Sequence, residues 1–294
     1  MAISKFLDPK NDFAFKKIFG NEKNKSILIS FLNDILGFRK GEKIKEVTFL
    51  NNILDPDTQA KKQSIVDVLC VDEKGTQYIV EMQVARYSGF EKRAQYYAAK
   101  AYVNQMREGE AYHNLKEIIF LAITDFEMFP DKTVYQSNHI ILDQDSHDHD
   151  LKDFSFCFLE LPKFTKTIDE LETTVDKWMY FFKHAPETTM AELQEAIGEN
   201  TAIRDAYHVL DRYYWTDKEI NTYEQMKKID LDNKVVLEAA LDRKFDEGKA
   251  EGLAEGEKAK KDTLRAIARE LLARGISMNE ITVMTGLTEE EIKM

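Results

Sequence analysis

The sequence predicts an α/β (α+β) core followed by an all-helical C-terminal region. Strand-length runs rich in β-branched and aromatic residues occur together with amphipathic helix patterns within residues 1–165, which predicts the core. From about Thr167 onward the patterns are helical only, which predicts the second region. We therefore divide the chain into a core at 1–165, a helical extension at 166–245, and a charged helical linker with a helix-turn-helix-like tail at 246–294.

A first, short helix is predicted within residues 11–24, where Asp12 can cap the N-terminus and Gly20 suits the C-terminal exit. A third helix within 88–109 has Ser88 and Glu91 as its predicted capping box. A second helix is predicted between the first and the third. It ends at Gly37 and has six apolar side chains on one face: Ile27, Leu28, Phe31, Leu32, Ile35 and Leu36. Strands are predicted at 45–50, at two runs within 64–85, and at 117–126, 138–143 and 154–162.

The composition narrows the class of protein. Of 294 residues, 43% are hydrophobic and 11% aromatic, which provides a sizeable core and excludes wholesale disorder. The net charge of −12 counts against a broad nucleic-acid surface but leaves room for a local basic groove. The N-terminus has no apolar signal-peptide region, and no run approaches the about 18 apolar residues of a membrane span, so we expect a soluble, cytoplasmic protein. Cys70 and Cys157 lie in apolar runs and are predicted to be buried free thiols, with a single disulfide as the alternative.

An acid interrupts each of two neighbouring strand patterns in SIVDVLCVDEKGTQYIVEMQVA, residues 64–85. A three-residue loop at 73–75, with Gly75 in the left-handed position, would join the two strands. Counting outward from this loop sets Asp67 opposite Glu81 on one face of the sheet, with Cβ atoms about 4.5–5.5 Å apart. The sequence therefore predicts two facing carboxylates.

Two facing carboxylates among aliphatic side chains are costly, because like charges repel and burial strengthens the repulsion. A shared proton, basic neighbours or a divalent cation must compensate. A hard cation such as Mg²⁺ accepts one or two carboxylates and otherwise keeps water or phosphate oxygens. Asp67, Glu81 and the backbone carbonyl of Met82 would make such a site, where the ion could polarise a phosphate and generate a nucleophilic water. The alternative is an open face on which the acids are solvated.

The stretch DVLCVDEKGTQYIVEMQV resembles the D…ExQ form of the PD-(D/E)XK nuclease motif, in which glutamine stands where lysine is more usual. Other segments are similar to those of the nuclease-family transposases, also called Rpn recombination-promoting nucleases. They are DPKNDFAFKKIFG, FLNDILG, EKRAQYYAAKAYVNQMREGEAYHNL and EIIFLAITDF, and the similarity covers roughly residues 5–165. The charged tail also looks like theirs. The resemblance implies a restriction-endonuclease-like core with a mixed central sheet flanked by helices.

The resemblance also implies roles for individual residues. Asp67 and Glu81 would hold Mg²⁺ or Mn²⁺, and Gln83 would take the place of the motif lysine, where it can orient a water but cannot serve as an ionisable base. Asp12 could supply a further acid to the metal, with helix capping as the alternative. Basic residues around the next helix could contact a DNA backbone, although exposed basic residues are common: Arg86, Lys92, Arg93 and Lys100.

Other charged groups are predicted to have simpler roles. Lys16 and Lys17 are expected on a solvated face rather than at phosphates. The loop 143–150, with His147 and His149 among four aspartates, is expected to be a solvated acidic loop, since it lacks fixed metal-ligand spacing. Neither a GxGxxG motif nor a P-loop occurs, so a nucleotide cofactor has no support.

The function we expect is a metal-dependent DNA endonuclease that hydrolyses phosphodiester bonds, with a role in transposition or recombination implied by the resemblance alone. The alternative is a catalytically weak or inactive nuclease-fold module that binds DNA or a protein partner, which Gln83 and the net acidity favour. A third hypothesis is an assembly protein that acts through its helical half, with the C-terminal region forming a homo-oligomer.

Overall fold

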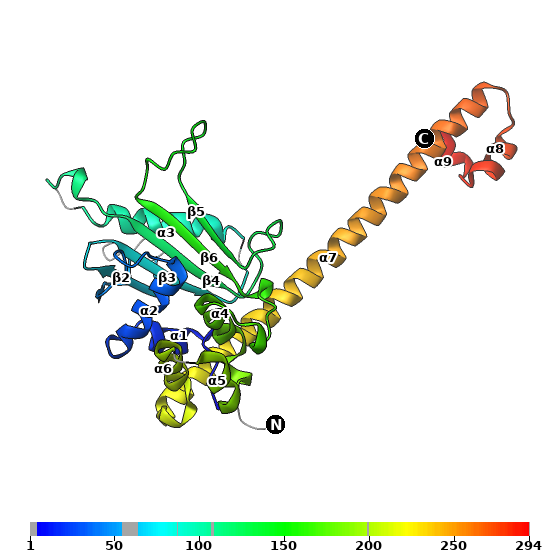
Figure 1. Ribbon diagram of the computed structural model, residues 1–294. Coiled ribbons are helices and arrows are strands. Elements are labelled where there is room, and N and C mark those ends of the chain that lie inside the picture. The colour runs from blue at the N-terminus through cyan, green and yellow to red at the C-terminus, as the bar shows by residue number, and fades with distance from the viewer. Residues whose placement is uncertain (1–4, 55–63, 87, 107–108, 199, 294) are drawn as a thin grey trace. The chain divides into compact units, whose positions relative to one another are not determined.

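The computed structural model describes residues 5–54, 64–86, 88–106, 109–198 and 200–293. The chain forms two compact units, Met1–Lys228 and Ile229–Met294. Within the described residues, the first unit is built around a six-stranded mixed sheet with strand order β1-β2-β3-β4-β6-β5 (Figure 1). The α/β architecture and the mixed sheet predicted from the sequence are confirmed.

The strand pairs are parallel in the middle of this sheet and antiparallel toward both of its edges. β1, β2 and β3 pair antiparallel, β3 and β6 each pair parallel with β4, and β5 pairs antiparallel with β6. β4 is buried along its whole length, as its continuous apolar run predicts. The strands are β1 (Val47–Phe49), β2 (Val68–Asp72), β3 (Gln77–Gln83), β4 (Ile118–Thr124), β5 (Gln136–Ile140) and β6 (Phe154–Glu160).

Helices cover both faces of the sheet (Figure 1). On one face, α3 (Phe90–Val103) packs its small residues Ala94 and Ala98 against the apolar side chains of the strands. On the other face lies the larger core, rich in aromatic side chains. Its helices are α1 (Asp12–Phe19), α2 (Lys25–Leu36), α4 (Thr174–His184) and α6 (Thr201–Leu210), with α5 (Met190–Ile197) beside them. Short 3₁₀ turns lie at Glu22–Asn24, Tyr112–Asn114, Leu161–Lys163, Ile168–Glu170, Ala185–Glu187 and Arg212–Tyr214.

The β2–β3 hairpin has the register that its loop predicts. Val68 pairs with Val80, and the amide of Asp72 donates to the carbonyl of Thr76 at 3.0 Å. Gly75 has φ of +93°, the left-handed conformation expected of it. The predicted three-residue loop is therefore confirmed.

Two predicted helix starts are wrong. α1 is capped by Asn11, whose side-chain oxygen accepts from Phe13 N at 3.1 Å and Ala14 N at 3.3 Å, and not by Asp12. Asp12 lies one position further on, in the first helical turn, where its carboxylate pairs with Lys16. α3 follows Gly89, which has φ of +81° and makes no side-chain cap, so the capping box of Ser88 and Glu91 does not form.

α7 (Asp217–Ala273) contributes its first turns to the first unit and the remainder to the second. In the second unit α8 (Met278–Thr285) and α9 (Glu289–Lys293) follow, joined at Gly286 with φ of +69°. The tail that the sequence likens to a helix-turn-helix thus contains two short helices around a Thr-Gly turn. Their small core consists of Ala268, Ile281, Leu287 and Ile292. The division at residues 165 and 245 stays a prediction, and the helices α4 and α6 share the core of α1 and α2.

Both cysteines, Cys70 and Cys157, are buried and free, as predicted. Burial raises the pKa of each thiol to about 12, so neither is a reactive thiolate. Among the helices of the described residues, none combines the length and the apolarity that a membrane crossing requires.

Candidate active site

Asp67 and Glu81 meet at the end of the β2–β3 hairpin. The amide of Asp67 donates to Glu81 Oε1 at 3.0 Å, and the amide of Met82 donates to Asp67 Oδ2 at 2.9 Å. Each carboxylate therefore accepts a hydrogen bond from the backbone of the other strand. The exposed fraction of Glu81 is 5%, so the alternative of an open, solvated face is wrong for this residue.

The acids lie where the ladder between the two strands ends. Regular pairing stops at Val68, and the preceding residues turn to another partner: Val66 N donates to Asn52 O at 3.0 Å, and Ile65 forms a bridge with Ile53. β2 thus separates from β3 at Asp67. The two acid side chains satisfy the amides that the interrupted ladder leaves behind.

The carbonyl of Met82 is directed to the same side as Asp67. Residues of a strand alternate in the direction of their N–H and C=O groups. On β3, Gln77 N donates to Glu117 O and Gln83 O accepts from Asp125 N, both toward β4. Met82, one position before Gln83, therefore directs its amide and carbonyl toward β2, where its amide is bound by Asp67.

Burial raises the pKa of both acids. The pKa of Asp67 rises to about 6, with the amide of Met82 and the charge of Lys16 opposing the effect of burial. The pKa of Glu81 rises to about 8, because burial is reinforced by the nearby charge of Asp67. Carboxyl groups perturbed in this way are candidates for a functional site, because a proton or a cation must balance their charge.

Lys16 of α1 reaches this pair from the other face of the sheet. Its Nζ lies 2.6 Å from Asp12 Oδ1 and 3.3 Å from Asp67 Oδ1. The pKa of Lys16 is raised, because its ion pairs with the two aspartates outweigh the opposing effect of burial. Lys17 pairs with Glu219, and its Nζ lies 4.2 Å from the ring centroid of Trp215. The prediction that both lysines lie on a solvated face is wrong, because each is half-buried against an acid.

Gln83 is held in place by protein groups at both ends of its amide. Its Oε1 accepts from Arg93 Nη2, and its Nε2 donates to Ala85 O at 3.1 Å. The guanidinium of Arg93 lies 4.8 Å from the ring centroid of Phe90 and 5.7 Å from that of Tyr97. One N–H of the Gln83 amide remains for a further acceptor, since an amide carries two.

The four basic residues proposed to contact DNA differ in their surroundings. Arg86 and Lys92 are exposed, near the end of β3 and in the first turn of α3. Lys100 is half-buried, and its Nζ donates to Ser64 Oγ at 3.2 Å. Arg93 is bound to Gln83. The structure thus leaves Arg86 and Lys92 oriented toward solvent, while Arg93 and Lys100 face neighbouring protein groups.

The loop 143–150 is organised by its own backbone. Asp143 Oδ1 accepts from Asp145 N at 3.0 Å and from Ser146 N at 2.7 Å, and most of its residues are exposed. Across the described ranges, no group of three or more His, Cys, Asp or Glu side chains is arranged to hold a metal ion. The exposure of these residues agrees with the expectation of a solvated loop at 143–150.

The donor set at the hairpin suits a hard cation. Asp67 and Glu81 supply two carboxylates, and the Met82 carbonyl is directed to the same place. Mg²⁺ is commonly bound by one or two carboxylates, with water and phosphate oxygens at the remaining positions. Asp12 contacts Lys16 rather than the pair, so its role as a metal ligand stays a prediction.

Sequence reasoning missed the polar contacts that surround the hairpin end. Lys10 Nζ lies 3.0 Å from Asp125 Oδ2, and Asp125 N donates to Gln83 O at 3.0 Å. Lys16 and Arg93 also join the site. These residues are far from the hairpin in sequence or lie on another element, so no spacing pattern signals their approach.

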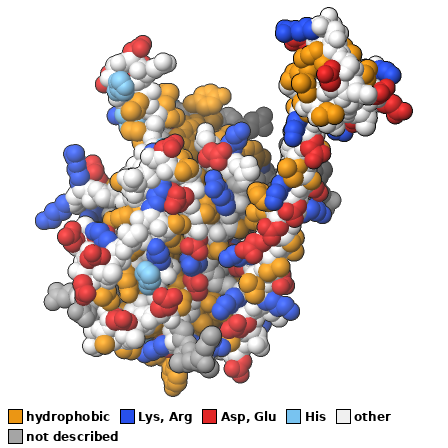
Figure 2. All heavy atoms as spheres, turned by 90° about the vertical axis from the view of Figure 1, so that its right-hand side faces the viewer, with side chains coloured by type: hydrophobic (Ala, Val, Ile, Leu, Met, Phe, Trp, Pro, Cys, Tyr) orange, Lys and Arg blue, Asp and Glu red, His pale blue; other side chains and the backbone are white. Residues whose placement is uncertain are grey.

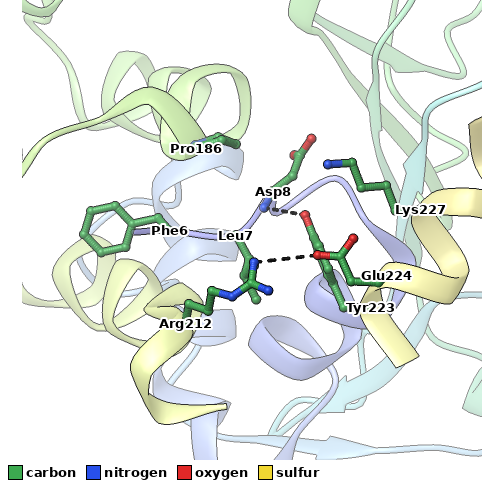
Figure 3. Close-up of a pocket in the computed structure, with 8 residues that line it drawn as sticks. All are labelled: Phe6, Leu7, Asp8, Pro186, Arg212, Tyr223, Glu224 and Lys227. Atoms are coloured by element: carbon green, nitrogen blue, oxygen red, sulfur yellow. Dashed lines mark hydrogen bonds and ion pairs between the residues drawn. The ribbon is translucent and has the colours of Figure 1, made fainter. Parts of the chain in front are cut away.

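A separate cavity of about 210 Å³ lies in the first unit, between the N-terminal segment and the start of α7 (Figure 3). There Asp8 N donates to Tyr223 Oη at 3.0 Å, and Arg212 Nη1 lies 3.6 Å from Glu224 Oε1. Burial raises the pKa of Asp8. None of the residues that line this cavity belongs to the carboxylate pair, so it is not the candidate active site.

Charge is mixed on the surface. On the face drawn in Figure 2, acidic and basic side chains of the described residues are interspersed. The expectation that any nucleic-acid contact is local stays a prediction.

Comparison with known proteins agrees with this fold. The family model described as PD-(D/E)XK nuclease family transposase matches residues 9–240. No curated protein and no solved structure gives a significant match to the chain. The matched region contains the whole sheet, the β2–β3 hairpin and both of its acids. Because this match extends over most of the sequence, the chain belongs to the family of PD-(D/E)XK nuclease family transposases.

Proposed function

We propose that the protein is a metal-dependent endonuclease that hydrolyses phosphodiester bonds of DNA, with Asp67, Glu81 and Gln83 as catalytic residues. The observation that carries this proposal is the buried carboxylate pair, in which the pKa of Glu81 rises to about 8. A pair of this kind is expensive to maintain unless a cation binds it. Family membership supplies the reaction class, because the family is one of nucleases.

Asp67 and Glu81 would hold Mg²⁺ or Mn²⁺ together with the Met82 carbonyl. Such an ion, when bound, would stabilise charge on a phosphate oxygen and lower the pKa of a water. The protein's own contribution is orientation: the backbone amides of Asp67 and Met82 fix one oxygen of each carboxylate. The other oxygens are then directed by the hairpin rather than by flexible side chains.

Gln83 would orient the attacking water. Arg93 and the carbonyl of Ala85 fix the plane of its amide, so its remaining N–H has one direction. Glutamine cannot accept the proton of that water, which distinguishes this site from one with the usual lysine. The proton must pass to solvent or to a phosphate oxygen of the substrate.

Arg86 and Lys92 would bind the DNA backbone beside the site. Both are exposed basic residues close to the end of β3, where Gln83 lies. Contacts of this kind position a duplex without reading its sequence. A role in transposition or recombination follows from the family description and belongs to this proposal.

A plasmid assay tests the proposal. Wild type and Asp67→Asn are incubated with supercoiled plasmid in Mg²⁺ or Mn²⁺, and Asp72→Asn serves as the control. Asp72 is a buried acid at the other end of the same hairpin, where it accepts from Tyr78 Oη at 3.0 Å. We expect nicking by wild type and by Asp72→Asn, and a loss of at least about 100-fold in Asp67→Asn. Equal nicking by wild type and Asp67→Asn would exclude hydrolysis at this site.

A second candidate function is a nuclease-fold module that binds DNA or a protein partner without useful catalysis. The engagement of Gln83 by Arg93 and Ala85 favours it, because the amide is restrained and not ionisable. In Ca²⁺, a gel shift at several salt concentrations separates the two candidates: binding with no nicking in Mg²⁺ or Mn²⁺ supports the module. A homo-oligomer through the C-terminal region belongs to the third hypothesis and stays a prediction.

A further inference from the structure

Asp67 has one oxygen already committed to the protein backbone. Its Oδ2 accepts from the amide of Met82 at 2.9 Å. Its other oxygen, Oδ1, lies 3.3 Å from Nζ of Lys16. The oxygen of Asp67 that is not bound by the Met82 amide is therefore the one that an ammonium group already contacts.

The side chain of Lys16 can move toward Asp67 or away from it while its helix stays in place. It lies on α1, whose apolar residues are buried in the core opposite α3, so the helix itself is fixed. Its side chain is 37% exposed, and its Nζ is shared between Asp67 and Asp12. Asp12 is 43% exposed and lies one helical turn before Lys16 on the same helix. The ammonium group can thus leave Asp67 with a short movement while remaining close to Asp12.

Lys16 also lies where its ammonium group can contact a phosphate oxygen of bound DNA. A DNA strand whose phosphate would be held by a cation at the carboxylate pair brings negative charge within reach of this ammonium group. A lysine is a strong phosphate contact because it is a compact point charge with three donors.

From these contacts we propose that Lys16 is a displaceable counter-ion of the carboxylate pair: it competes with the divalent cation for Asp67 and moves to a phosphate oxygen when DNA and the cation bind. This inference rests on the proposed metal-dependent nuclease function. It makes Lys16 a positioning residue that links cation binding to substrate binding. Without DNA, the ion pair lowers the affinity for the cation. With DNA, the phosphate draws Lys16 away and the competition ends.

Calorimetric titration of the full chain with Mn²⁺, without DNA, tests the competition. The variants are Lys16→Met, which keeps the length of the side chain without its charge, and Lys16→Arg, which keeps the charge. Lys17→Met is the matched control, because it removes the neighbouring charge on the same helix, where the partner is Glu219. Fluorescence melting of the two tryptophans verifies that each variant is folded.

We expect Lys16→Met to bind Mn²⁺ about threefold to fivefold more tightly than wild type, the range that a half-exposed ion pair contributes. Lys17→Met and Lys16→Arg should stay within about twofold of wild type. Unchanged or weaker Mn²⁺ binding in Lys16→Met would overturn the proposal. No heat of binding in any of the proteins would instead overturn the proposed metal site itself, which distinguishes the two failures.

Binding of a DNA duplex in Ca²⁺ at several salt concentrations tests the proposed contact between Lys16 and a phosphate. Loss of one phosphate contact reduces the slope of log affinity against log salt by about one. We expect this reduction in Lys16→Met and not in Lys17→Met. A slope equal to that of wild type would show that Lys16 does not move to a phosphate, and would overturn that part of the inference.

Discussion

The amide of Asp67 donates a hydrogen bond to Glu81 Oε1 at 3.0 Å, across the end of the β2–β3 hairpin. The backbone amide of Asp67 thus fixes the carboxylate of Glu81. Glu81 is nearly inaccessible to solvent, so the bond forms in a region of low dielectric, where it is strong and where two charges repel strongly. Hydrogen bonds thus fix the positions of the two carboxylates, while the repulsion between their negative charges is strong.

This repulsion predicts a pH dependence in the absence of metal. The folded-state pKa values, about 6 for Asp67 and about 8 for Glu81, exceed the ordinary values of 3.8 and 4.5. The folded protein therefore binds more protons than the unfolded chain between these values, and its stability falls as pH rises through them. In a chelator, we expect the free energy of unfolding to fall by on the order of a few kcal/mol as pH rises from 3.8 to about 8, the range between the ordinary and the folded-state values.

Glu81→Gln isolates this effect, because glutamine keeps the oxygen that accepts from Asp67 N and loses the charge. Urea unfolding followed by the fluorescence of Trp178 and Trp215, both in the first unit, is the measurement. Above about pH 8 the variant should be more stable than wild type, and its pH dependence should be smaller. An identical fall of stability in both proteins would mean that the pair is not its source.

Restoring the motif lysine is expected to harm the site. In Gln83→Lys, the guanidinium of Arg93 loses its acceptor and meets an ammonium group instead. We expect lower plasmid nicking than in wild type, by about tenfold or more, equivalent to a loss of about 1.4 kcal/mol or more. The double variant with Arg93→Gln removes the repulsion and should recover part of the activity. Higher activity in the single variant would contradict the role given to Arg93.

The hairpin loop depends on the conformation of Gly75. Its φ of +93° is unfavourable for residues with a Cβ, and an added Cβ would lie 3.0 Å from Cγ of Lys116. Gly75→Ala should therefore lower the free energy of unfolding by about 1–2 kcal/mol, with Gly75→Asn less affected. Gly41→Ala is the control, because Gly41 has open space and an ordinary φ. A change below about 0.3 kcal/mol in Gly75→Ala would argue against strain at this loop.

Replacing the glycines of α7 by alanine should stabilise the helix, in contrast to the replacement of Gly75. Gly248, Gly252 and Gly256 lie inside the helix with open space around each Cβ position. Alanine favours the helix over glycine by about 1 kcal/mol per position at exposed sites. Replacing all three should slow amide hydrogen exchange in this part of the full-length chain. Unchanged exchange would mean that other contacts already hold the segment.

The hairpin shows how much of the site could be predicted from sequence. Its loop length and its glycine set the register, and the period of two along a strand then brings Asp67 and Glu81 to one face. The continuous apolar run likewise identified β4 as a buried strand. These are local patterns, in which each residue's position follows from its neighbours in the chain.

The remaining site contacts are not local. Lys16 reaches Asp67 because α1 packs on one face of the sheet, and Arg93 reaches Gln83 from the other face. A helical period shows which side chains share a face but not which partner that face meets. The cap of α1 was misplaced by one position because Asn11 and Asp12 are both competent caps, and only the backbone geometry distinguishes them.

The closeness of the two acids along the chain has a consequence for the order of assembly. They are 14 positions apart and joined by one tight hairpin, whereas Lys16 comes from a helix that must dock from a distance. Short-range contacts form early in folding, so the negative charges should be brought together before their lysine arrives. During that interval the nascent strand pair carries unbalanced charge, and divalent ions or mild acid should accelerate refolding.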